Sequence, residues 1–130
     1  MGKSILKDKS YTFAIRTVNL NRHLRDQKRE FVLSKQILRC GTAIGALIRE
    51  AEFGQSRGDF RNKMYIALKE ANETDYWLSL LKDTHYIELK EYESMSADCA
   101  ELICMLVATV KTTAPPYERW YEASFLTFSF

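Results

Sequence analysis

Two glutamates, Glu70 and Glu73, are the residues of this 130-residue chain whose type and spacing come nearest to a catalytic site. Carboxylates three positions apart lie on one face of a helix, and di-iron helix bundles combine such glutamates with a histidine three residues further on. The only histidines, His23 and His85, do not follow a glutamate at that spacing. We therefore expect Glu70 and Glu73 to form a structural polar network with Arg49 or another basic residue of the preceding helix, which fixes the helix register.

The other reactive side chains also lack the partners that catalysis needs. The three cysteines, Cys40, Cys99 and Cys104, fall on apolar faces of the expected helices, and no cysteine or serine is placed beside a histidine with a carboxylate. The glycine-flanked segment at residues 54–58 does not match the phosphate-binding pattern G-x-x-x-x-G-K-[ST]. We therefore expect a protein that is not an enzyme and that binds no metal ion and no cofactor.

Hydropathy and cysteine number predict a cytoplasmic protein without a membrane segment. The longest uninterrupted apolar run covers residues 102–108, which is far shorter than the roughly 20 residues that cross a bilayer. The N-terminus has neither the apolar stretch nor the small-residue cleavage site of a secretion signal. An odd number of cysteines suits reduced thiols rather than disulfides.

Charge is divided unequally along the chain, although the net charge is only +2. Residues 1–70 contain 15 of the 19 Lys and Arg and 7 of the 17 Asp and Glu, a net charge of +8, whereas residues 71–130 have a net charge of −6. Solvated helix faces alone can produce this division. Two functional interpretations remain open: opposite surfaces meet between subunits of a head-to-tail ring, or the basic half binds an anion such as nucleic acid.

Basic residues concentrate near the end of the first expected helix and near the turns. Nine of them are the predicted nucleic-acid contacts: Arg16, Arg22, Arg25, Lys28, Arg29, Lys35, Arg39, Arg57 and Arg61. Contacts of this kind to phosphates make binding fall steeply with salt. In the alternative, a protein–protein interaction scaffold without nucleic-acid binding, the same surface contacts other subunits or an acidic protein.

Apolar residues at alternating spacings of four and three predict an all-α, antiparallel, up-down-up-down four-helix bundle. We expect helices over about residues 9–27 and 34–54, a third that begins after Ser56 and ends near Thr84, and a fourth that ends near Thr113. The expected inward positions are Phe13, Thr17, Leu20, Asn21 and Leu24; Ile37, Gly41, Ile44, Ile48 and Ala51; Phe60, Met64, Ala67, Ala71, Thr74, Leu78 and Leu81; and Met95, Cys99, Leu102, Leu106 and Thr109.

Gly41 and Gly45 predict a close helix–helix contact in the second helix. Each glycine costs roughly 1 kcal/mol of helix propensity relative to alanine. The absence of a side chain at both positions, one turn apart, lets a neighbouring backbone approach.

The last residues of the chain break the helical pattern. Residues 1–114 are expected to form the bundle, and residues 115–130 an aromatic tail with Tyr117, Trp120, Tyr121, Phe125, Phe128 and Phe130. Because six exposed aromatic side chains would favour aggregation, we expect the tail to pack on the bundle or on a neighbouring subunit, unless it is a non-native extension.

Two segments closely resemble a known family. The run LSKQILRCGTAIGALIREAEFGQSRGDF (residues 33–60) and the run ALKEANETDYWLSLLKDTHYI (residues 67–87) are similar to bacterial four-helix-bundle proteins encoded in intervening sequences of large-subunit ribosomal RNA genes. The chain departs from the family at Ala43 and Leu47, where members often have serine and asparagine, and the aromatic tail lies outside the resemblance.

The resemblance implies an assembly and partners as well as a fold. The same superfamily includes the accessory protein of diversity-generating retroelements, a ring-shaped homopentamer that binds a reverse transcriptase and nucleic acid. By this likeness we expect a homo-oligomer, with a pentamer favoured, that binds RNA or DNA or a protein partner. The resemblance implies no catalytic residue.

Overall fold

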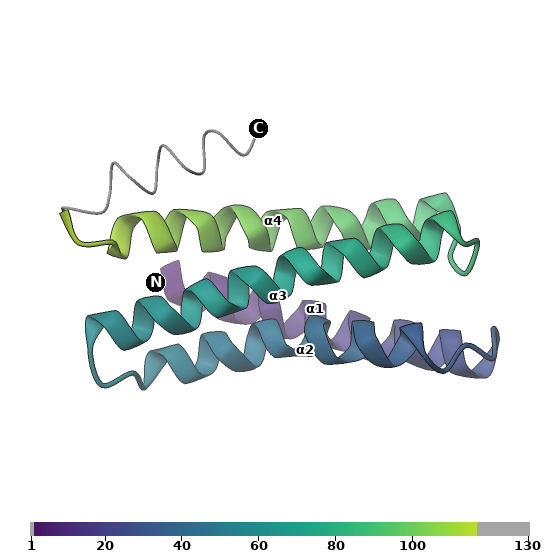
Figure 1. Cartoon of the computed structure of the whole chain (residues 1–130), viewed down its shortest axis with the longest axis horizontal. Helices are drawn as coiled ribbons and strands as arrows, with labels where there is room; N and C mark the ends of the chain where they lie inside the picture. The colour runs from purple at the N-terminus through teal and green to yellow at the C-terminus, as the bar shows by residue number, and fades with distance from the viewer. Residues whose placement is uncertain (1, 117–130) are drawn as a thin grey trace.

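The chain folds into four antiparallel helices joined by short loops. The computed structural model describes residues 2–116, with side chains from residue 5. The helices are α1 (Gly2–Asp26), α2 (Leu33–Glu52), α3 (Arg57–Asp83) and α4 (Leu89–Thr113), and no strand occurs in this described part. Figure 1 shows that successive helices reverse direction, so the α1–α2 and α3–α4 loops lie at the same end. The predicted all-α bundle is confirmed.

The predicted inward positions form the core. In α2 all five are buried, and in α3 the same holds from Met64 to Leu81. Burying one such aliphatic side chain stabilises the fold by about 1.5–3 kcal/mol. Three details differ from the expectation: Leu20 and Phe60 are only partly buried, and in α4 the buried position near the end belongs to Val110 rather than Thr109.

Helix α1 begins seven residues earlier than expected, at Gly2 rather than near Lys9. Leu6 and Ser10 are both buried, with exposed fractions of 3% and 0%, and they extend the inward stripe of Phe13 towards the N-terminus. The spacing of this stripe is again four and three. The sequence pattern missed it because Leu6 stands among lysines and Ser10 is polar.

Helices α1 and α2 approach closely at the two glycines. A Cβ atom added to Gly41 would lie 2.6 Å from Cγ2 of Thr17, and one added to Gly45 would lie 3.3 Å from the backbone oxygen of Ser10. The first distance is shorter than any ordinary carbon–carbon contact, so the missing side chain at Gly41 is what allows this packing.

Side chains satisfy the free amides at three helix starts. Ser56 Oγ accepts a hydrogen bond from the Asp59 amide at 3.1 Å, which starts α3 as predicted. Glu88 and Glu91 form a reciprocal capping box at the start of α4. At the start of α2 the buried Glu30 carboxylate accepts hydrogen bonds from the amide of Ser34 at 2.8 Å and that of Val32 at 3.2 Å. Such caps stabilise a helix start by about 1 kcal/mol.

Packing is unequal around the bundle. Helices α1 and α4 contact each other much less than the other three neighbouring pairs do. Polar groups bridge this seam: Lys9 Nζ lies 3.0 Å from Glu101 Oε1, and Arg16 pairs with Asp98. None of the four helices, over the residues described, is long and apolar enough to cross a membrane. The predicted packing of the aromatic tail concerns residues outside the described range, apart from Pro115 and Pro116.

Candidate nucleic-acid interface

Five of the nine predicted nucleic-acid contacts lie together where α1 passes into α2. Arg22 and Arg25 belong to the last turns of α1, Lys28 and Arg29 to the loop, and Lys35 to the first turn of α2. All five side chains are exposed. We call these five residues the basic end. Because cations are favourable near a helix C-terminus, the end of α1 accommodates this charge at little cost.

The positive charge of the basic end is not balanced by ion pairs over residues 5–116. None of its five cations forms an ion pair with another residue in the part of the chain that the structure describes. The two nearby acidic residues do not change this, because Asp26 makes no such pair and the Glu30 carboxylate is hydrogen-bonded to the backbone of α2. Arg29 also has a left-handed backbone, with φ of 55°, which lets the loop turn sharply. The result is a concentration of exposed positive charge at one end of the bundle.

The other four predicted contacts are engaged within the chain. Arg57 donates hydrogen bonds to the carbonyl oxygens of Thr112 (3.2 Å) and Thr113 (3.3 Å), and Arg61 donates one to that of Val110 (3.4 Å). These carbonyls belong to the last turn of α4, where cations satisfy unpaired oxygens and oppose the helix dipole. Arg57 and Arg61 therefore hold the C-terminal end of α4 against the start of α3.

Arg16 and Arg39 are the remaining two, and both bind carboxylates of the acidic half. Arg16 pairs with Asp98 and donates to Ser94 Oγ at 2.7 Å. Together with the pair of Lys9 and Glu101, these contacts neutralise part of the basic half within one chain. The charge division therefore supports the fold of a single chain.

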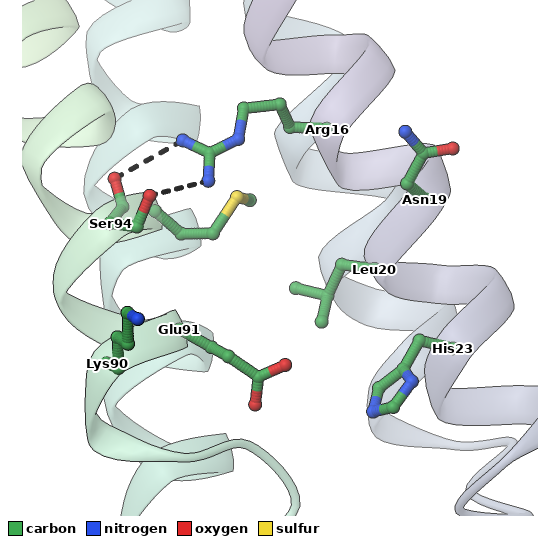
Figure 2. Close-up of a pocket in the computed structure, with 8 residues that line it drawn as sticks. Arg16, Asn19, Leu20, His23, Lys90, Glu91 and Ser94 are labelled. Carbon is green, nitrogen blue, oxygen red and sulfur yellow. Dashed lines mark hydrogen bonds between the residues drawn. The ribbon is translucent and has the colours of Figure 1, made fainter.

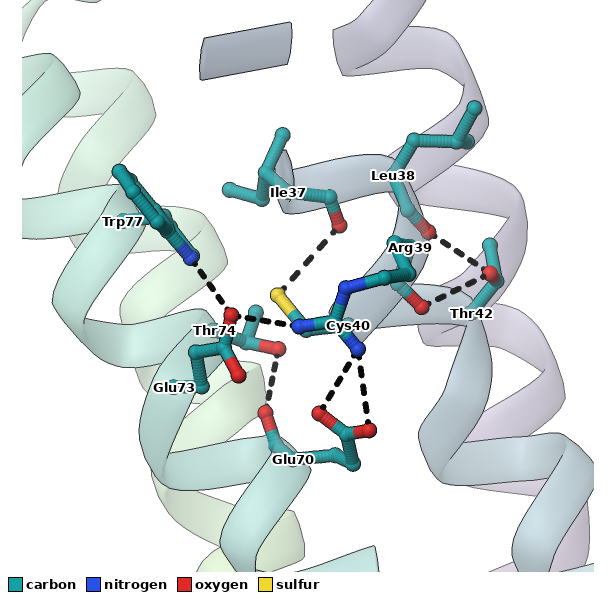
Figure 3. A network of polar contacts seen from close by, with 9 residues as sticks. All are labelled: Ile37, Leu38, Arg39, Cys40, Thr42, Glu70, Glu73, Thr74 and Trp77. Carbon is teal, nitrogen blue, oxygen red and sulfur yellow. Dashed lines mark hydrogen bonds and ion pairs between the residues drawn. The ribbon is translucent and has the colours of Figure 1, made fainter. Parts of the chain in front are cut away.

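Arg39, rather than Arg49, is the centre of the predicted glutamate network, which Figure 3 shows. Arg39 Nη1 lies 3.1 Å from Glu70 Oε2, and Nη2 lies 2.5 Å from Glu73 Oε2. Trp77 Nε1 donates to the same Glu73 oxygen at 3.0 Å. The hydrogen bonds from Trp77 and Arg39 lower the pKa of Glu73, while the bond to Glu73 raises the pKa of Arg39.

Of the partners expected for the two glutamates, another basic residue of the preceding helix, Arg39, is the one present, and the helix register excludes Arg49. Helices α2 and α3 are antiparallel around a tight turn, so residues near the turn face each other, as Glu50 and Lys63 do at 3.1 Å. Arg49 is adjacent to that pair and lies ten residues, about 15 Å of helix, from Arg39. The Arg49 guanidinium instead lies over the ring of Tyr11, with Cζ of Arg49 5.1 Å from the ring centroid.

Within the described part of the chain, the cysteines, histidines and carboxylates do not form a metal-binding group. Over residues 2–116, no group of three or more His, Cys, Asp and Glu side chains is arranged to hold a metal ion. Burial raises the pKa of Cys99 to about 12 and also raises the pKa of Cys40, so both thiols stay protonated at neutral pH. Cys104 is exposed.

An open groove of about 510 Å³ lies between α1 and α4 near the end of the bundle that carries the basic end (Figure 2). Arg16, Asn19, Leu20 and His23 line it from α1, and Lys90, Glu91, Ser94 and Met95 line it from α4. Its floor is apolar, and its rim carries both charge signs. The groove therefore lacks the excess of positive charge that distinguishes the basic end.

Phe31 and Val32 are surface features that the sequence patterns did not identify. They follow the basic loop and are 55% and 69% exposed. A smaller pocket of about 310 Å³ lies beside Phe31, between α1 and the start of α2. The signal was present as two apolar residues shortly after the cations Lys28 and Arg29, but a loop residue has no helical period by which to classify it.

Comparisons with known proteins agree with this architecture. A family model described as 23S rRNA-intervening sequence protein matches residues 3–108. A crystal structure from Bacteroides thetaiotaomicron VPI-5482, titled as a protein with unknown function from the S23 ribosomal protein family, is 56% identical and has a TM-score of 0.84. The match covers 85% of this chain and 99% of that one. The search of curated proteins finds no match.

Proposed function

Because the chain belongs to the family of 23S rRNA-intervening sequence proteins, we propose that it is a non-enzymatic, homo-oligomeric bundle that binds RNA through its basic end. The observation that supports this function is the group of five exposed cations without an ion-pair partner in the described chain. Each such cation can replace a counterion on a phosphate. A protein of this kind works in the cytoplasm, where RNA is available.

The distribution of charge at that end supports assembly into a ring, which we propose to be a pentamer. The α3–α4 loop lies at the same end as the basic loop (Figure 1), and acidic residues are exposed there: Asp83, Glu88, Glu91 and Glu93. Opposite charges on the two sides of one subunit suit a head-to-tail contact with the next. In such a ring each subunit adds one basic end, so a long RNA can be held at several points.

Charge reversal at the basic end tests RNA binding. The Lys28→Glu/Arg29→Glu variant is compared with a matched control, Lys69→Glu/Lys111→Glu, which reverses two exposed lysines elsewhere. Fluorescence anisotropy with labelled single-stranded RNA gives the affinity at several salt concentrations. Five phosphate contacts predict a slope of about −3.5 in log affinity against log salt, or roughly a 100-fold loss between about 50 and 200 mM.

The first variant should lower that slope by about 1.4 and weaken binding far more than the control does. Equal effects of the two variants, or wild-type affinity that does not change with salt, would refute the electrostatic function. The light-scattering mass of each variant is measured in parallel, because a change of assembly would mimic a loss of binding.

The open groove between α1 and α4 favours a second function, a protein–protein interaction scaffold without nucleic-acid binding. Its apolar floor and mixed-charge rim suit a polypeptide better than a phosphate backbone (Figure 2). Under this alternative, Lys28→Glu/Arg29→Glu changes the oligomer mass or the binding of a protein partner and has no effect on RNA.

A further inference from the structure

The pocket beside Phe31 has the size of a single small ligand and opens next to the basic end. Its volume of about 310 Å³ lies at the lower limit of small-molecule sites, roughly 300–1,000 Å³. Residues from α1, the loop and α2 line it: Asn21, Arg25, Phe31, Ser34, Lys35 and Leu38. Two of the five cations of the basic end therefore stand at its rim.

The rim of the pocket combines an aromatic face with positive charge. Phe31 is 55% exposed, although an aromatic ring in water normally packs against apolar neighbours. Arg25 and Lys35 are exposed and make no ion pair with a described residue. An exposed aromatic ring that shares a pocket with unpaired cations suits the binding of unpaired nucleotides, since the ring can stack on the base while the cations face the phosphates.

The wall of the pocket has an acceptor without a donor. Asn21 is 7% exposed, and its Nδ2 donates a hydrogen bond to the Ser34 carbonyl oxygen at 3.0 Å. Its Oδ1 receives no hydrogen bond from any residue in the described part of the chain. Buried amide oxygens nearly always have a partner. A ligand with an N–H group, such as the edge of a nucleobase, would supply that partner.

We propose that this pocket binds one unpaired nucleotide of single-stranded RNA. The base stacks on Phe31 and donates to Asn21 Oδ1, while Arg25 and Lys35 contact the flanking phosphates. The bases of a duplex are stacked inside the helix and cannot enter a pocket of this size, so the site selects single strands. This inference rests on the proposed RNA-binding function and specifies its substrate class.

The test compares variants of the full chain on two probes, a fluorescein-labelled oligouridine and a labelled RNA duplex of the same length. Phe31→Ala removes the stacking surface, and Phe31→Trp keeps one. Val32→Ala is the matched control, because Val32 is a neighbouring exposed residue that does not line the pocket. Circular dichroism and light-scattering mass verify that each variant keeps its fold and assembly.

Phe31→Ala should weaken oligouridine binding by roughly 5- to 150-fold, the usual effect of one lost base–aromatic stack. The salt slope should stay at its wild-type value because no cation is removed. Phe31→Trp should retain the affinity, Val32→Ala should leave it unchanged, and duplex binding should not respond to Phe31→Ala.

Two results would overturn the inference while leaving RNA binding itself intact. The first is that Phe31→Ala and Val32→Ala bind oligouridine with the same affinity. The second is that Phe31→Ala weakens binding of the duplex as much as it weakens binding of oligouridine. A changed oligomer mass in Phe31→Ala would show that the Phe31 side chain contacts another subunit, and this result would also overturn the inference. If the wild-type chain binds neither probe, the proposed function fails together with this inference.

Discussion

Replacing Gly41 by alanine tests whether α1 and α2 depend on the missing side chain. Alanine gains about 1 kcal/mol over glycine in helix propensity. Its Cβ, however, would lie 2.6 Å from Cγ2 and 2.7 Å from Oγ1 of Thr17, which is fully buried and hydrogen-bonded to the Phe13 carbonyl oxygen at 2.9 Å. Forcing extra volume into such a core costs about 1–3 kcal/mol. Gly41→Ala should therefore lower the free energy of unfolding by up to about 2 kcal/mol.

A double-mutant cycle isolates the steric cause. In a Thr17→Ala background the two closest atoms are gone and only the 3.2 Å approach to the Cβ of residue 17 remains, so Gly41→Ala should be neutral or stabilising there. The expected coupling free energy is about 1–3 kcal/mol. Gly58→Ala is the control, because its Cβ would have 3.8 Å to the nearest atom, Ser56 Oγ.

Urea unfolding followed by circular dichroism gives the four free energies. All proteins are measured at one concentration, since subunit association would otherwise shift the apparent stability. A coupling free energy within about 0.5 kcal/mol of zero would refute the close approach of the two helices at this point.

Two further predictions concern ionisable groups. Hydrogen bonds from Trp77 and Arg39 lower the pKa of Glu73 from its ordinary value of 4.5. The ionised Glu73 therefore stabilises the fold fully above pH 4.5, and this contribution to the free energy of unfolding is lost as the pH falls through the lower pKa of the folded state. Glu73→Gln should reduce the loss of stability at acid pH, as measured by the free energy of unfolding against pH. The reduction should be less than about 1 kcal/mol because the Glu73 side chain is 37% exposed. An unchanged loss of stability at acid pH would contradict the role of Glu73 in this network. A thiol reagent at neutral pH should modify only Cys104 in the native chain and all three cysteines after unfolding, because Cys40 and Cys99 are buried and protonated. The Cys104→Ser variant should then show no native reaction, and modification of a second native thiol in the wild type would contradict the buried assignment.

The sequence predicted the fold well because helix packing depends on position within a repeat. The alternation of four and three from Ile37 to Ala51 reports which residues face a neighbour, and all of them are buried. The start of α1 was missed where the same stripe passes through the isolated Leu6 and the polar Ser10. A hydropathy pattern has no means of recognising a buried serine.

The candidate interface was predicted only in part. Net charge per segment located the basic end, because runs such as Arg22 to Arg29 are visible in the sequence. Which cations are engaged within the chain depends on the register between helices, and no local pattern encodes it. For this reason Arg39 was assigned to nucleic acid, and the partner of the glutamates was left open between Arg49 and another basic residue of the same helix, whereas Arg39 binds Glu70 and Glu73.

The weak seam between α1 and α4 sets how the molecule can open. Helices α2 and α3 each have two well-packed neighbours, whereas the first and last helices each have one. Amide protons in α2 and α3 therefore exchange with solvent only through nearly global unfolding, while those of α1 and α4 can exchange when a single helix detaches. The bundle thus consists of a stable central hairpin, α2 and α3, with two separable outer helices. A helix α1 that detaches from its own hairpin can dock on the hairpin of another copy, which is domain swapping.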